Sequence, residues 1–358
     1  MTNEHKHLDF TGQDIYIGID VHLRSWSVSI YTKDFEHKTY TQPADTRVLV
    51  NYLRKNFPGG NYKSAYEAGF SGYWLHDELK LNGIESMIVN PSDIPLKDKD
   101  RKNKTDRIDS RRLAKSIRSN MLEGIYIPTD QQREDRTLLR TRQAMVRKQT
   151  RVKNQIKSFL YFYGITITEE DIGKHWSRNY VQWLDNIILR EESGTFALKV
   201  YLEELKHLKG LIAQTTRQIR QLAANQRYTK LVKLLVSIPG ISTLSAMTLL
   251  TEIHEVGRFK KFDYLNSYVG LKPSEHSSGE KINKTDITQR KNAYLRHILI
   301  ESSWIAIKKD PALLMAYHKF ISKGKTKSRA IIKIARKLLN RIYYVLKSEQ
   351  PYCLGIVE

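Results

Sequence analysis

The chain has 358 residues, with 60 Lys and Arg against 38 Asp and Glu, so its formal net charge is +22. This length allows two or three domains, and a hydrophobic fraction of 40% is enough for a packed core. The single cysteine, Cys353, excludes a disulfide framework and a cysteine-based zinc site, and it fits a reducing cytoplasm. No apolar run approaches the roughly 18 residues of a membrane span, and the polar N-terminus has no signal-peptide core. The charge favours a polyanionic partner, DNA or RNA.

The first third of the chain predicts an α/β domain. Short apolar or alternating runs predict strands, and apolar residues at helical spacing predict helices. The expected strands are 16–20, 25–31, 38–42, 63–67, 85–90 and 124–128, and the expected helices are 44–57, 73–81 and the last part of 97–118. Strands 16–20 and 25–31 are expected to be antiparallel neighbours. This order of elements is that of the ribonuclease-H-like fold.

Four carboxylates occupy notable positions in this domain. Asp20 and Glu67 each close a strand, and ligands of open α/β sheets bind at strand ends. Asp106 and Asp109 are three residues apart, so a helix places them on one face. Carboxylates gathered in one place repel each other unless a cation such as Mg²⁺ or Mn²⁺ lies between them. The alternatives are a strand-end turn for Asp20, a surface acid for Glu67, and a solvated helix laced with ion pairs for the aspartates.

Basic residues surround the two aspartates. Residues 97–118 include ten Lys and Arg and four Asp. A metal-dependent nuclease needs this combination, because cations bind phosphates while acids hold the metal that activates them. The candidate nucleic-acid ligands here are Lys102, Lys104, Arg107, Arg111 and Arg112.

The middle of the chain predicts long helices. Residues 130–163 are helical in pattern and basic, and residues 198–222 repeat apolar positions at alternating spacings of three and four. This narrow seam favours a coiled coil, whose partner is either helix 130–163 of the same chain or another subunit. Residues 231–252 form two apolar helices joined at 239–242, either a DNA-binding helix-hairpin-helix or an ordinary αα-hairpin.

The last third carries a candidate nucleophile. Ser277 and Ser278 precede Gly279 in what the sequence predicts to be a polar loop. An exposed serine among cations can attack a phosphodiester while the cations stabilise the developing charge. Ser-Gly is common in ordinary loops, so spacing alone is weak evidence. The cations proposed to bind nucleic acid are Lys272, Lys281, Arg290 and Arg296. Helices separated near residues 310–311 and 324 complete the chain, and residues 323–341 are again basic.

Together these motifs resemble a known family. IGIDVH, YEAG and KTDRIDSRRLA are similar to the N-terminal half of the DEDD transposases of bacterial insertion sequences, which include Piv-type invertases and bridge-RNA-guided recombinases. The apolar hairpin, GL-x-P, S-G and I-T-x-R are similar to the C-terminal domain of the same family. The resemblance covers about residues 15–346. One departure is Lys291, where many members have glycine; a positive φ there would strain lysine.

The resemblance implies a mechanism and an organisation. It implies a RuvC-like domain at residues 10–128 that holds Mg²⁺, or Mn²⁺, on Asp20, Glu67, Asp106 and Asp109. Long basic helices follow at 129–228, and a transposase domain at 229–358 supplies Ser278, with Ser277 as the alternative nucleophile. The implied partners are donor and target DNA, an element-encoded guide RNA, and further copies of the chain in a dimer or tetramer. Asp109 and Ser278 must then meet within one chain or between subunits.

Overall fold

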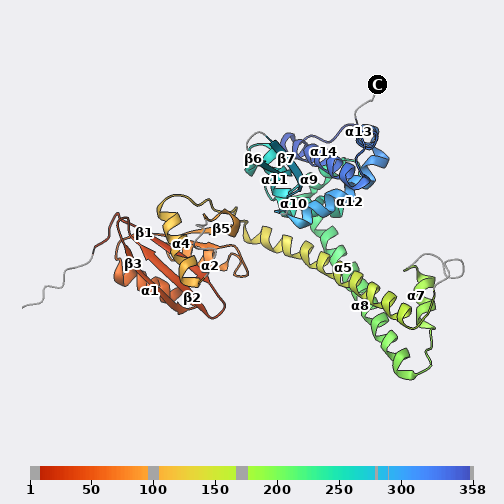
Figure 1. Ribbon diagram of the computed structural model, residues 1–358, viewed down its shortest axis with the longest axis horizontal. Coiled ribbons are helices and arrows are strands. Elements are labelled where there is room, and N and C mark those ends of the chain that lie inside the picture. The colour runs from red at the N-terminus through yellow and green to blue at the C-terminus, as the bar shows by residue number, and fades with distance from the viewer. Residues whose placement is uncertain (1–8, 96–104, 167–175, 279–280, 289, 355–358) are drawn as a thin grey trace, which may run out of the picture. The chain divides into compact units, whose positions relative to one another are not determined.

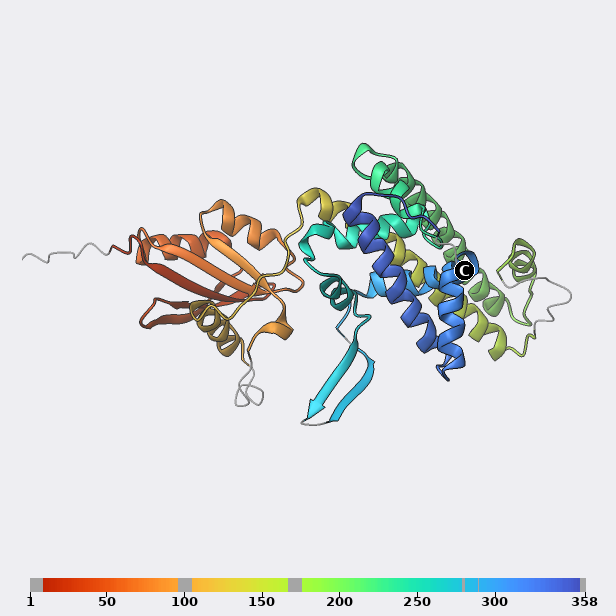
Figure 2. The same cartoon turned by 90° about the horizontal axis from the view of Figure 1, so that it is seen from above.

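The computed structural model describes residues 9–95, 105–166, 176–278, 281–288 and 290–354, with residues 273–278 and 281–286 described by their backbone. It divides into two compact units, residues 1–127 and 128–358. Figures 1 and 2 show the elements of each unit. None of the described helices has the combined length and apolar character needed to cross a membrane.

The first unit is built on a five-stranded mixed sheet. The strand order is β3-β2-β1-β4-β5; β1, β2 and β3 are successive antiparallel neighbours, whereas β4 is parallel to β1 and β5 to β4. The strands are β1 (Asp14–Val21), β2 (Ser25–Tyr31), β3 (Glu36–Pro43), β4 (Asn61–Glu67) and β5 (Glu85–Val89). The helices are α1 (Thr46–Asn56), α2 (Trp74–Leu81), the short η1 (Pro91–Asp93) and α4 (Asp106–Arg118). The strands and helices expected from 16 to 118 are therefore confirmed, but 124–128 is not a strand, since only Gly124 forms an isolated bridge, to Val89.

Helix α4 lies directly on the sheet because small residues line the contact. A Cβ added to Gly18 of β1 would stand 2.0 Å from the carbonyl oxygen of Ser110 and 2.5 Å from the backbone nitrogen of Ala114. The buried Ser110 hydroxyl lies 3.1 Å from that of Ser27 and 2.9 Å from that of Ser29, both on β2. This close contact fixes the N-terminus of α4, and with it Asp106 and Asp109, beside β1.

The second unit is mostly helical. Its elements are α5 (Asp130–Phe162), α7 (Arg178–Asp185), α8 (Glu192–Ala223), α9 (Gln226–Val236), α10 (Thr243–Ile253), η2 (Val256–Arg258), α11 (Phe262–Val269), β6 (Pro273–Ser278), β7 (Lys281–Ile287), α12 (Ala293–Lys309), α13 (Pro311–Ser322) and α14 (Lys327–Ser348). The expected final helices and their two breaks are confirmed. Asp310 caps α13 by accepting a hydrogen bond from the Leu313 N–H, and it also pairs with Arg341.

The seam of α8 packs on α5 of the same chain. Leu198, Leu205 and Leu208 of α8 share a buried cluster with Ile156 and Leu160 of α5. Near the other end of the pair, Ile219 shares a cluster with Leu139. Because the late part of α5 meets the early part of α8, the two helices are antiparallel, as Figure 1 shows. Of the two partners that the sequence left open, the structure provides the helix of the same chain.

An ion pair between the half-buried Arg140 and the buried Glu252 joins α5 to α10 in the second unit. The guanidinium of Arg140 donates two hydrogen bonds to Glu252, which is 1% exposed, at 2.7 and 2.8 Å. Asn292, the N-cap of α12, donates to the same carboxylate at 2.8 Å. Fully bonded in this way, the buried charge holds three helices in register.

Candidate functional site

Three side chains meet at the end of β1. The Nε2 atom of His22 lies 3.2 Å from Oδ2 of Asp20 and 3.4 Å from Oδ2 of Asp106. One ligand atom from each of the three lies within 4.8 Å of the others. Asp20 lies near the end of β1, His22 follows directly after the strand, and Asp106 begins α4. Both aspartates were predicted from the sequence, whereas His22 was missed, although it stands two residues after Asp20, where strand alternation returns a side chain to the same face.

The electrostatics of Asp20 fit a cation. Burial raises the pKa of its carboxyl above the ordinary value; His22 offsets part of this rise, and the carboxylates of Asp106 and Asp109 add to it. A half-buried carboxylate beside two others is costly while unneutralised. Two carboxylates and an imidazole are ligands that divalent metals accept, so these residues fit a metal such as Mn²⁺ or Mg²⁺.

The other two acids are joined by an arginine. Arg112 lies 2.5 Å from Oδ1 of Asp109 and 3.7 Å from Oε1 of Glu67. Asp109 is buried, and the Arg112 side chain is only 13% exposed. The structure thus brings all four acids to one edge of the sheet, with His22 beside one pair and Arg112 between the other. Arg112, expected to bind nucleic acid, instead neutralises two acids of the site.

The remaining cations of this region differ in their setting. Lys102 and Lys104 lie outside the described residues. Arg107 is exposed on the first turn of α4. Arg111 is about half exposed, and its Nε donates to Thr39 and pairs with Glu36, each at 2.9 Å. Arg107 is therefore the described cation of α4 best placed to meet a phosphate.

The two candidate serines lie on a strand. Ser277 and Ser278 end β6, which pairs with β7 in an antiparallel hairpin where Ser278 stands opposite Lys281. Gly279 lies outside the described residues. The prediction of a loop was wrong at the serines. The backbone hydrogen bonds that join two strands form between polar residues as readily as between apolar residues. Figure 2 shows this hairpin extending from the helices of its unit.

The base of the hairpin is tied to the helices by Arg296. This buried side chain on α12 donates to the carbonyl oxygens of Gly270 and Thr288, which flank the hairpin. Its guanidinium therefore binds protein backbone, and the prediction that Arg296 contacts nucleic acid was wrong. Lys272 and Arg290, by contrast, are exposed beside the hairpin. Lys291 is not among the described residues with positive φ, so lysine is unstrained there.

The turn between α9 and α10 packs closely against α12. Gly240 has φ +91°, and an added Cβ would lie 2.5 Å from the Ser302 carbonyl oxygen of α12. The turn glycine thus serves close packing between helices. This contact favours the ordinary αα-hairpin over a turn that presents its N–H groups to a phosphate.

Taken together, a mixed sheet with acids at the ends of β1 and β4 and on α4 is consistent with the ribonuclease-H-like domain of a DEDD nucleic-acid enzyme. Comparison with known families agrees. Residues 17–165 match the DEDD transposase model typified by IS110, and residues 232–319 match the model described as the transposase IS116/IS110/IS902 family. The chain therefore carries both transposase domains of the IS110/IS116 family. Transposases are enzymes that cut and join DNA.

Individual relatives agree with this family. The chain is 26% identical over 239 residues to the Sinorhizobium fredii transposase y4qE, covering 67% of this chain and 57% of that protein. It therefore spans less than two thirds of that relative. It is 23% identical over 347 residues to the transposase of insertion sequence IS1111A from Coxiella burnetii, covering 94% and 88%. A shorter match, 35% over 102 residues, covers 28% of this chain and 32% of the pilin gene-inverting protein of Moraxella lacunata.

Proposed function

We propose that this protein is an insertion-sequence transposase that acts as a site-specific DNA recombinase. The observation that carries the proposal is the gathering of Asp20, His22 and Asp106 within metal-binding distance in the part of the chain that matches the DEDD transposase model. The other two acids of the site, Glu67 and Asp109, both contact Arg112.

In this proposal Asp20 and Asp106 hold a divalent metal, with His22 as a further ligand or as the partner that orients Asp20. A bound metal supplies positive charge to a scissile phosphate and to the oxygen that attacks or leaves it. Arg112 holds Asp109 and Glu67 in place, because its guanidinium lies between two carboxylates that otherwise repel one another. Arg107 adds a cation at the open side of α4, suited to a neighbouring phosphate.

The nucleophile of the proposal is Ser278, with Ser277 as the alternative. The serine Oγ forms a bond to phosphorus as the bond from phosphorus to one deoxyribose oxygen breaks, which releases a strand end with a free hydroxyl. The DNA is then held as a phosphoserine diester. Attack by the hydroxyl of a new partner strand reverses the step, so rejoining requires no ATP. Lys272 and Arg290 flank the hairpin and are suited to bind the DNA near the serine.

Selection of the DNA is assigned to an element-encoded guide RNA that pairs with target and donor. This part rests on the family resemblance, and the net charge of +22 is compatible with binding both nucleic acids. Because recombination joins two duplexes, the active form contains several copies of the chain.

Two alternative functions make different predictions. In a water-using RuvC-like nuclease the acids are essential and the serines are dispensable. In a DNA invertase whose protein part recognises the DNA site directly, the serine is essential and a guide RNA is not required. The similarity to the pilin gene-inverting protein supports DNA inversion as the alternative function.

The test uses the full chain purified from cells that carry its native flanking DNA. Bound RNA is sequenced, and a supercoiled plasmid with the element ends is incubated with the protein and Mg²⁺ or Mn²⁺. Asp20→Asn is expected to abolish cleavage, whereas Asp34→Asn, which changes an exposed acid of the same unit, is expected to leave it intact. Protein–DNA adducts are detected on denaturing gels.

The adduct is expected to disappear with Ser278→Ala and to persist with Ser277→Ala. The reverse pattern moves the nucleophile to Ser277. Cleavage that survives both changes establishes the water-using nuclease. Activity without one discrete bound RNA supports the invertase, and cleavage that is unchanged in Asp20→Asn refutes the metal site.

A further inference from the structure

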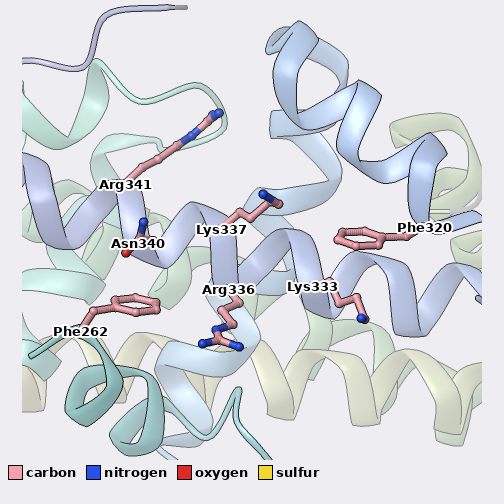
Figure 3. Close-up of a pocket in the computed structure, with 7 residues that line it drawn as sticks. All are labelled: Phe262, Phe320, Lys333, Arg336, Lys337, Asn340 and Arg341. Atoms are coloured by element: carbon pink, nitrogen blue, oxygen red, sulfur yellow. The ribbon is translucent and has the colours of Figure 1, made fainter.

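A basic pocket of about 570 Å³ lies between α11, α13 and α14 of the second unit. Phe262 of α11 and Phe320 of α13 stand at its two ends, and α14 contributes Lys333, Arg336 and Lys337 between them (Figure 3). Its volume is within the roughly 300–1,000 Å³ of small-molecule sites, so a single nucleotide has room there. The residues that line this pocket belong neither to the acidic site nor to the hairpin that carries the candidate serines.

The charge of the pocket comes from a helix with no acids. α14 has seven Lys and Arg and no Asp or Glu, and its opposite face is buried in the core. In the described part of the chain, no carboxylate lies within ion-pair distance of Lys333 or Lys337. Arg336 lies 3.5 Å from Asp263, but both side chains are about half exposed or more, so this pair is weak. The cations therefore remain available to an anion.

The two rings give the pocket a second recognition element. Phe262 and Phe320 are partly buried and pack against the main core of the unit, which fixes their positions. The Lys333 ammonium lies 5.0 Å from the centroid of the Phe320 ring, and the Arg336 guanidinium lies 6.0 Å from that of Phe262. Each aromatic surface is thus paired with a cation, an arrangement that matches a planar base joined to a phosphate.

We propose that this pocket binds an unpaired nucleotide of a single-stranded polynucleotide. The base stacks on Phe262 or Phe320, and the adjoining phosphates contact Lys333, Arg336 and Lys337. A duplex does not fit this pattern, because its bases are stacked on one another and present only their edges, not their faces, to a protein. An acidic peptide satisfies the cations but gives the two rings no planar partner.

This inference rests on the proposed function only in requiring that the protein acts on nucleic acid. Either an RNA strand or a DNA strand opened during recombination has the required chemistry. Affinity for RNA and DNA oligomers of equal sequence distinguishes the two sources.

The test is fluorescence anisotropy of the full chain with labelled 12-residue oligo-dT, oligo-U, their duplexes, and an abasic oligomer of equal charge. Phe320→Leu and Phe262→Leu keep an apolar side chain while removing the ring. The variant that removes the stacking ring is expected to weaken oligo-dT or oligo-U binding about five- to tenfold, the loss of one stacked base, and to leave abasic binding unchanged. Thermal unfolding of each variant confirms folding.

The cations are tested by salt dependence. In the double variant Lys333→Gln/Lys337→Gln, log affinity is expected to fall less steeply with log salt concentration. The magnitude of the slope decreases by about 1.4, roughly 0.7 for each phosphate contact that is lost. Lys199→Gln with Lys209→Gln removes the same charge from exposed positions of α8 and is the matched control. Equal slopes for the two double variants overturn the proposal, as does equal loss of abasic and base-containing oligomers with the Phe variants.

Competition by polyglutamate to the same extent as by the oligomers makes the site one for acidic peptides, and also overturns the proposal. The result is separable from the proposed recombination. Ring-dependent strand binding in a protein that cuts no plasmid supports the pocket while the catalytic proposal fails. If plasmid cleavage is lost in Asp20→Asn but oligomer binding is unaffected by the Phe variants, the catalytic proposal is supported and the pocket proposal fails.

Discussion

Replacing Gly18 with alanine is expected to disable the acidic site without touching any acid. The new methyl carbon would lie 2.0 Å from the Ser110 carbonyl oxygen and 2.5 Å from the Ala114 backbone nitrogen. Both are backbone atoms of α4, so no side chain can rotate away to make room. The helix must move as a body from the sheet.

The size of that movement follows from the contact distances. Carbon atoms in ordinary contact are about 3.5 Å or more from their neighbours, so the closest approach demands a shift of roughly 1.5 Å. Overpacking of this kind costs about 1–3 kcal/mol in unfolding free energy. The shift also carries Asp106 away from Asp20 and His22, and loss of such support lowers metal affinity about 10- to 100-fold.

The assay combines thermal unfolding with titration of Mn²⁺ by calorimetry. Gly69→Ala is the matched control, since Gly69 is exposed in the same unit and an added Cβ has no neighbour closer than 3.9 Å. The control is expected to melt and bind Mn²⁺ like the parent chain. Gly18→Ala is expected to melt at least about 5 °C lower, a shift that corresponds to about 1–2 kcal/mol for a unit of this size.

The reasoning is refuted if Gly18→Ala melts with the parent and binds Mn²⁺ equally well. A lower melting temperature with unchanged Mn²⁺ affinity shows instead that α4 tolerates the shift and that its position does not limit metal binding.

Three further outcomes follow from buried charges. Arg112→Met leaves Asp109 buried without its cation, so we expect a loss of about 3 kcal/mol in urea unfolding that added Mn²⁺ partly restores; no rescue by Mn²⁺ means that the metal does not approach Asp109. Arg140→Met is expected to cost about 3–5 kcal/mol because Glu252 is 1% exposed, and restoration by the double variant with Glu252→Gln tests this cause. Burial and nearby arginines lower the pKa of His254 to about 4, below the ordinary value near 6.5. The unfolded chain therefore binds more protons between those values, stability falls as pH falls through this window, and His254→Gln should flatten the decline in melting temperature; an unchanged profile contradicts the assignment.

Local sequence determined most elements of both units. The runs at 16–20 and 25–31 predicted paired strands because alternating apolar residues form one buried face of a sheet, and both are confirmed. Asp310-Pro311 predicted a helix break, since aspartate caps a helix that proline can begin, and α13 starts there. Asp20, Glu67, Asp106 and Asp109 were chosen from strand ends and helix spacing, and the structure places all four along one edge.

Other features depend on contacts between residues distant in the sequence. The hairpin β6–β7 was missed because its polar strands lack the apolar alternation from which strands are predicted. Arg112 and Arg296 resembled surface cations because composition cannot tell whether an arginine faces solvent, a carboxylate or a backbone carbonyl.

The sequence by itself determined most of the elements, the charge and the set of acids, since these depend on near neighbours and on residue type. Only the tertiary structure decided that His22 joins Asp20 and Asp106, that Arg112 joins Asp109 to Glu67, and that Gly18 admits α4 to the sheet. The physical reason is that each of these arrangements depends on the distance between two elements. That distance is set by the packing of side chains far apart along the chain.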